Sequence, residues 1–274
     1  MAIVTITRGL HSGGEKLAES IAQKLGARCV SSEVLREAAK TYNVPEEKLS
    51  DVFESAPTFW ERMTESRRVY LAYVQAQLAE WARDDNLVYH GNAGQELLRE
   101  APHALKVRIM VPIEERVRII MQRFNFDHDK AAQYVEKIDD DRTRRMRYFY
   151  NTDWRDSRRY DLTINLGRVT MEAAEEIILG LLQRPEFRLS EATAPAFNDF
   201  LIKSRVHALL AGALVGRLSL ITVTVTQGVV RLQGTLTSNE AVIEQLVDQV
   251  RQLPGVKAVN NEIVVGLVYQ EWNV

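Results

Sequence analysis

The chain has 274 residues, of which 46% are hydrophobic and 26% are charged, and its formal net charge is -2 at pH 7. This composition excludes a disordered or fibrous protein, and the length suffices for two domains at roughly 150 residues each. The near-neutral charge disfavours a protein that binds nucleic acid through a generally basic surface, so any anion site must be local.

The chain contains one cysteine, Cys29, which therefore cannot form an intramolecular disulfide. Its apolar surroundings predict a buried, unreactive thiol. The first residues, MAIVTITRG, lack a basic stretch followed by a long apolar run, and no segment reaches the ~20 apolar residues that span a bilayer. We therefore expect a cytoplasmic protein without a transmembrane segment.

The N-terminal part opens as strand, loop and helix. The β-branched run from Ile3 to Thr7 predicts a buried strand. A glycine-rich stretch follows, and then Leu17, Ile21 and Leu25 recur at helical spacing. Gly26 predicts the end of that helix.

Strands and helices continue to alternate through the first two-thirds of the chain. The expected elements are a helix over 58–83, strands over 86–90 and 106–111, a helix over 114–124, a charged helical stretch to about 150, a strand over 160–165 and a helix over 171–182. This alternation predicts an α/β domain with a parallel sheet covered by helices on both faces, because each crossover must pass over the sheet. We assign this domain to residues 1–188.

Periodicity fades over 184–198, which contains two prolines, and we assign 189–198 as a linker. A second domain, 199–268, is expected beyond it, with a helix over 199–217, strands over 220–226 and 229–234, a helix over 238–252 and a strand over 256–265. Gln227-Gly228 predicts a tight hairpin turn, and Ser238 is the expected N-cap of the last helix. This small α+β (αββαβ) module shows no polar cluster suited to catalysis, which favours a regulatory or ligand-binding role.

The loop after the first strand is the strongest candidate site. It reads Gly9-Leu10-His11-Ser12-Gly13-Gly14-Glu15-Lys16, in the strand-to-helix context of the phosphate-binding loop G-x-x-x-x-G-K-[ST]. Its backbone N–H groups and the positive end of the following helix predict anion binding. The candidate cofactor-binding residues are Gly9, His11, Ser12, Gly13, Gly14 and Glu15.

The motif is incomplete, however. Glu15 stands at the position of the usual lysine, Lys16 follows one place late, and Leu17 replaces the hydroxyl that binds magnesium. The alternative interpretation is a glycine-rich turn without a ligand.

Arginines are concentrated between residues 116 and 159. Arg142 and Arg145 are separated by three residues, so they share one helix face and suit a phosphate clamp. With Lys16 they are the catalytic candidates. The alternative is a solvated helix whose arginines pair with the acidic run 139–141.

Four segments together resemble the cytidylate-kinase-like family, which belongs to the P-loop nucleoside monophosphate kinases: TITRGLHSGGEKLAESIAQKLG, VYHGNAGQELL, VPIEERVRIIM and NTDWRDSRRYDLTINLGRVTMEAAEEII. The resemblance runs through most of residues 1–183. It implies a P-loop kinase fold, an ATP site with Mg²⁺ at the glycine loop, and lid arginines at positions 142 and 145. The implied reaction is phosphoryl transfer from ATP to a nucleoside monophosphate, cytidylate being the first candidate.

The same resemblance implies an acceptor site. Ser32, Glu33 and Arg36, in the segment SSEVLR, match the place where such kinases begin to bind the acceptor nucleotide. Asn92, in GNAG, lies where relatives carry a GRGG-like turn, so the resemblance implies that an arginine is missing here.

The C-terminal segments ITVTVTQGVVRLQGTLTS and LPGVKAVNNEIVV resemble a BON domain, over about residues 200–265. The resemblance implies an interaction with a phospholipid or another small ligand, although Gly228 and Gly255 also suit simple turns. The alternative function of the whole chain is a catalytically weak or inactive nucleotide sensor that signals through this domain, and a membrane-surface tether ranks last. The sequence leaves a homo-oligomer open.

Overall fold

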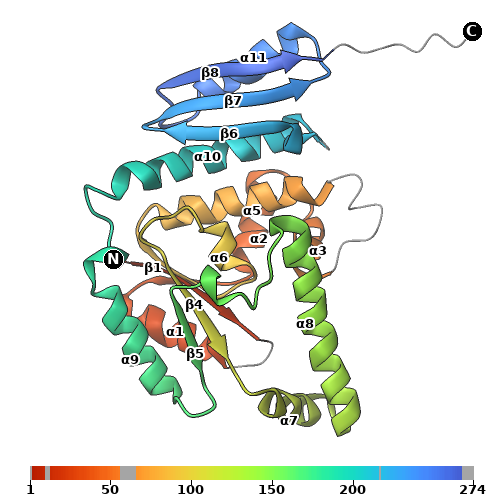
Figure 1. The fold of residues 1–274 in the computed structure, drawn as a ribbon, viewed down its shortest axis with the longest axis vertical. Coiled ribbons are helices and arrows are strands. Elements are labelled where there is room, and N and C mark those ends of the chain that lie inside the picture. Colours follow the sequence, from red (N-terminus) through yellow and green to blue (C-terminus); the bar gives the residue numbers. More distant parts are fainter. Residues whose placement is uncertain (1, 10–12, 56–65, 216, 267–274) are drawn as a thin grey trace, which may run out of the picture.

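The computed structural model describes residues 2–9, 13–55, 66–215 and 217–266 (Figure 1). Two sheets organise these residues, a larger one in the N-terminal part and a smaller one in the C-terminal part. The N-terminal part has an α/β fold and the C-terminal part a small α+β fold, as the sequence predicts.

The larger sheet has five parallel strands in the order β2-β3-β1-β4-β5. Its strands are β1 Ala2–Arg8, β2 Arg28–Val30, β3 Asn86–Tyr89, β4 Leu105–Met110 and β5 Leu162–Asn165. The expected parallel sheet is thus confirmed. Cys29, on strand β2, is half-buried rather than fully buried, and burial raises the pKa of its thiol.

Helices cover both faces of this sheet, because neighbouring residues of β1 point to opposite sides. The helices of this domain are α1 Gly14–Leu25, α2 Glu33–Thr41, α3 Glu46–Glu54, α5 Ser66–Ala82, α6 Gly94–Leu97, α7 Ile113–Phe124, α8 His128–Tyr150 and α9 Met171–Leu182. Ile3 packs with the core beneath α2, α3 and α5, whereas Val4 and Ile6 pack with the core beneath α1 and α9. Short 3₁₀ turns lie at Ser157–Arg159, Pro185–Phe187 and Leu218–Leu220.

Helices α7 and α8 form a hairpin beside the sheet (Figure 1). Val117 and Ile120 of α7 pack against Ala131 and Val135 of α8. The Asp127 side chain caps α8 by accepting the backbone N–H of Lys130. The C-terminal half of α8 thereby returns to the carboxyl edge of the sheet, where the site described below is formed.

The C-terminal domain contains a mixed sheet of order β6-β7-β8, packed on two helices. Its elements are α10 Ala194–Ala213, β6 Ile221–Thr226, β7 Val229–Leu236, α11 Glu240–Arg251 and β8 Ala258–Val265. The predicted hairpin turn is present, with positive φ at Gln227 and Gly228. The predicted N-cap of α11 is wrong: Asn239, not Ser238, accepts the N–H of Val242.

Helix α10 begins at Ala194, five residues before the expected start and inside the segment assigned as linker. Pro195 does not prevent this, since proline fits the first turn of a helix. The early turns bury Phe197 and Phe200 in the core of the first domain. Later turns bury Val206 and Leu210 in the core of the second domain.

Helix α10 also packs along α5 of the first domain (Figure 1). The Arg205 guanidinium forms a bidentate ion pair with Glu80 of α5, and the Lys203 ammonium lies 2.7 Å from the Glu100 carboxylate. One helix therefore contributes to both cores. Among the residues that the structure describes, no helix is long and apolar enough to cross a membrane.

Candidate functional site

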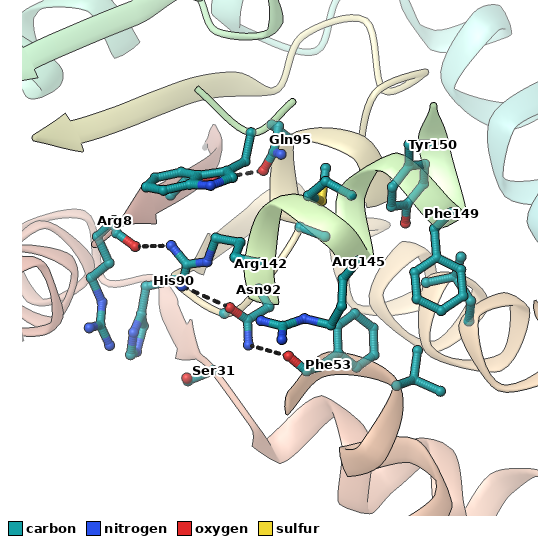
Figure 2. A pocket seen from close by; sticks show the side chains of 17 residues that line it. Arg8, Ser31, Phe53, His90, Asn92, Gln95, Arg142, Arg145, Phe149 and Tyr150 are labelled. Carbon is teal, nitrogen blue, oxygen red and sulfur yellow. Dashed lines mark hydrogen bonds between the residues drawn. The ribbon is translucent and has the colours of Figure 1, made fainter. Parts of the chain in front are cut away.

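A cavity of about 190 Å³ opens at the carboxyl ends of β1, β2 and β3, the edge where parallel α/β sheets place their ligands (Figure 2). Strand ends and the turns after them supply one wall, and helices α3, α5 and α8 supply the others. The residues that line it are Thr7, Arg8, Ser31, Val52, Phe53, Leu71, His90, Gly91, Asn92, Ala93, Gln95, Arg142, Arg145, Met146, Phe149, Tyr150 and Trp154. We call this space the site cavity.

The two arginines predicted from the i, i+3 spacing both line the site cavity. Arg142 donates to the backbone carbonyl of Arg8 and, over 3.1 Å, to the Oδ1 of Asn92. Arg145 is buried and donates to the carbonyl of Glu54 over 2.9 Å. Burial, and then the neighbouring Arg145, lower the pKa of Arg142 to about 10, so its guanidinium stays charged at neutral pH. Arg8 lines the cavity as well, and three arginines on one cavity favour an anionic ligand.

Three uncharged groups of the cavity wall carry a buried polar atom without a partner in the described part of the chain. These atoms are the His90 Nδ1, the Gln95 Nε2 and the Tyr150 hydroxyl. Burial, with Arg8 second, lowers the pKa of His90, so its ring is neutral at pH 7. Unpaired polar atoms cost free energy unless a ligand satisfies them, which points to a hydrogen-bonding ligand with a polar edge.

Arg8, which directly precedes the glycine loop, lines this cavity, whereas the described loop residues Gly9 and Gly13 to Lys16 do not. Gly13 caps α1 in the left-handed conformation, at φ 72°. The two other described glycines, Gly9 and Gly14, are buried. Glu15 and Lys16 are both exposed, so neither side chain is buried against the loop. His11 and Ser12, also predicted to bind cofactor, lie outside the described residues.

The predicted acceptor-site residues are placed unequally. Asn92 lines the site cavity, where its Nδ2 donates to the carbonyl of Phe53 and its Oδ1 accepts from Arg142. Ser32, Glu33 and Arg36 are exposed and do not line the cavity. Ser31, one residue earlier, takes that place, because Ser32 and the residues after it turn into α2. A substrate role for the three exposed residues stays a prediction.

Sequence reasoning missed several groups at the site. Arg116 of α7 is buried, forms two hydrogen bonds of 2.8 Å with Asp139, and places its guanidinium 3.2 Å from the position that a Cβ on Gly9 would occupy. Trp154 is buried, and the Arg142 guanidinium lies 4.9 Å from its ring centroid. In the sequence, Arg116 is one arginine of the arginine-rich region, and no spacing distinguishes it from the others. Trp154 lies in a segment that resembles the family, but nothing in that segment marks it as a site residue.

The alternative interpretation of the arginine-rich region applies to a different subset. Arg144 of α8 is exposed and pairs with Asp141 at 2.7 Å, as that interpretation expects. Arg155, beyond the helix, lies 4.0 Å from Asp140, whereas Arg147 and Arg158 pair with Asp153 and Asp156 outside the acidic run. Exposed pairs of this kind contribute little to stability. The arginines are thus divided between exposed ion pairs and the buried site.

Comparison with known proteins finds relatives for both parts of the chain. Residues 3–168 match the model of the Cytidylate kinase-like family, and residues 198–266 match that of the BON domain. Cytidylate kinase from Sulfolobus acidocaldarius is 24% identical over 174 residues, which are 63% of this chain and 90% of that protein.

Solved structures resemble the first domain. An uncharacterized protein from Eubacterium ventriosum matches 66% of this chain and 98% of its own, with a TM-score of 0.52 and 22% identity. Shikimate kinase from Bacteroides thetaiotaomicron matches 67% of this chain and 99% of its own, with a TM-score of 0.42 and 14% identity. The family match spans more than half of the chain, and the parallel sheet with its site cavity is the matched part. The chain therefore belongs to the cytidylate kinase-like family and carries a C-terminal BON domain.

Proposed function

We propose that this protein binds ATP at the 9–16 loop and transfers its γ-phosphoryl group to a nucleoside monophosphate in the site cavity. The observation that carries the proposal is the composition of that cavity, which combines three arginines with three uncharged polar atoms that lack partners among the described residues. Guanidinium groups suit phosphate, and unpaired polar atoms suit the edge of a base. Cytidylate is the first acceptor to test, because the Sulfolobus relative is named a cytidylate kinase.

The described residues suit phosphoryl transfer because this reaction depends on positioning and charge neutralisation rather than on a reactive side chain. Arg142 links the end of β1 to Asn92, and Arg145 links α8 to the end of α3. Elements from both sides of the cavity are thus held together by the groups that would meet the phosphates.

The residues fit a phosphate-bearing cofactor better than a resident metal ion. Among the described residues, no group of three or more His, Cys, Asp or Glu side chains is placed to hold a metal. The two carboxylates near the loop, Glu15 and Asp139, already face Arg8 and Arg116. Mg²⁺ is therefore expected to arrive with ATP, held mainly by the phosphates.

A second candidate is a nucleotide sensor without turnover, in which the BON domain reports occupancy and has a phospholipid or small-molecule ligand of its own. Two observations favour it. Glu15 and Leu17 replace the residues that a complete loop uses for catalysis. Helix α5, whose Leu71 lines the site cavity, packs directly on α10, which belongs to the BON core as well.

The two functions separate in one experiment. The protein is incubated with Mg²⁺-ATP and each nucleoside monophosphate while ADP is measured, and binding is followed by calorimetry. ADP formation that depends on an acceptor, fastest with cytidylate, supports the kinase. Binding without acceptor-dependent ADP supports the sensor, and absence of any nucleotide binding refutes both.

A further inference from the structure

Arg8, the last residue of β1, lies across the start of α1. A Cβ on Gly14 would come within 2.6 Å of the Arg8 Cδ, so a glycine at that position gives the arginine side chain room to pass. The side chain then runs beside that of His90 (Figure 2). Its Nη2 reaches within 3.9 Å of the Glu15 carboxylate. A guanidinium thus lies next to the position that is a lysine in a complete phosphate loop.

The backbone and the side chain of Arg8 are positioned by different partners. Its carbonyl accepts from Arg142, which fixes the end of β1. Its guanidinium has Glu15 as its ion-pair partner, at a distance that leaves its N–H donors available, and its buried Nε has no partner among the described residues. The side chain is only 21% exposed, against 63% for Glu15, so Arg8 lines the cavity side and Glu15 the solvent side.

This arrangement would let a loop with a glutamate at the lysine position bind phosphate. Alone, a carboxylate at that position would repel a phosphate. The Arg8 guanidinium, 3.9 Å from that carboxylate, places an opposite charge beside it and opposes this repulsion. Arg8 also remains charged at neutral pH, although burial lowers its pKa against the opposing effect of Glu15.

Lys16 is the other candidate for the missing charge. It lies one residue after the lysine position, about 100° around the helix, and it is exposed. Arg8, in contrast, lines the site cavity.

We propose that Arg8 supplies the phosphate-binding charge that a lysine supplies in a complete loop, and that Glu15 is a positioning residue that holds the Arg8 guanidinium at the start of α1. This inference rests on the proposed function only in that a phosphate-bearing nucleotide binds at the loop, and it applies to kinase and sensor alike.

The test measures ATP affinity by calorimetry and thermal unfolding for the full chain and its variants. Arg8→Ala should weaken ATP binding by roughly tenfold or more, the size of effect of one charged hydrogen bond, with little change in unfolding temperature. Arg8→Lys should keep a large part of the affinity. Arg8→Ala combined with Glu15→Lys moves the charge to the usual lysine position and should recover most of the loss. Lys24→Ala is the matched control, because it removes a cation of α1 that pairs at 3.0 Å with Glu175 of α9, away from the loop.

Several results would overturn the inference. One is wild-type ATP affinity in Arg8→Ala, and another is an Arg8→Lys variant as weak as Arg8→Ala. The inference also fails if the double variant recovers no ATP affinity. It fails as well if Lys16→Ala lowers ATP affinity by the tenfold or more that is expected of Arg8→Ala. If the wild-type chain binds and turns over nucleotide and the Arg8→Ala variant binds ATP with the same affinity, only this inference fails. If the wild-type chain binds no nucleotide, the proposed function fails with it.

Discussion

Replacing Arg142 with alanine should affect both stability and ligand binding. Arg142 makes two charge-assisted hydrogen bonds, to the Arg8 carbonyl and to the Asn92 side chain. One such bond contributes about 1.5–3 kcal/mol, but both acceptors border the site cavity, where water can replace the lost donor. We therefore expect the free energy of unfolding to fall by about 1–3 kcal/mol. Nucleotide affinity should fall roughly tenfold or more, because one guanidinium of the clamp is gone.

Arg144→Ala is the matched control for this change. It lies on the same helix, two residues further along, but is exposed and forms an i, i+3 ion pair with Asp141. A pair of this kind contributes about 0.5 kcal/mol or less. Urea unfolding and calorimetry with ATP and cytidylate measure both quantities in both variants. Equal effects of the two substitutions on nucleotide affinity would show that Arg142 is not a ligand contact, whatever it contributes to stability.

Three further outcomes follow from the structure. Burial, and then Lys203, lower the pKa of His207 from 6.5 to about 4, so the unfolded chain takes up a proton before the folded one does. The free energy of unfolding should therefore fall as the pH drops from 6.5 towards 4, by about 2 kcal/mol at pH 5, and His207→Gln should flatten this slope in urea titrations at pH 7 and pH 5. Phe200→Ala should destabilise the chain by about 3–5 kcal/mol in urea unfolding, whereas Val242→Ala, at a side chain that is 48% exposed, should change little; similar values for both would refute the shared core. Limited proteolysis followed by mass spectrometry should find the first cut between Arg188 and Thr193, where the chain is exposed or half-buried, and a first cut inside α10 would refute it.

The architecture was accessible from the sequence wherever burial follows a simple period. Strand β1 reads as a β-branched run, and helix α9 was predicted with its observed ends, because the chain there obeys the periods of strand and helix. The start of α10 was not, because Pro195 resembles a breaker unless one knows that it lies in a first turn. The N-cap of α11 was misassigned because serine and asparagine cap helices almost equally well.

The candidate site was only partly accessible. Arg142 and Arg145 stood out, since a three-residue spacing on a helix fixes a common face. Arg8 did not, because its role depends on Gly14 and Glu15, which approach it only after the chain has turned into α1. His90 and Gln95 come from one segment and Tyr150 from another, and only the folded chain shows that their polar atoms lack partners among the described residues. Contacts between distant segments leave no periodic trace in the sequence.

The sharing of α10 between two cores affects how the protein forms during synthesis. Domains generally fold as units, the N-terminal one first while the rest of the chain is still being made. Here Phe197 and Phe200 complete the core of the first domain, and they are translated only at the beginning of the second. A nascent chain that ends at α9 exposes the apolar surface that these side chains cover. The first domain thus completes its native packing only after the ribosome has translated the first turns of α10. Folding of the first domain therefore overlaps in time with synthesis of the BON domain.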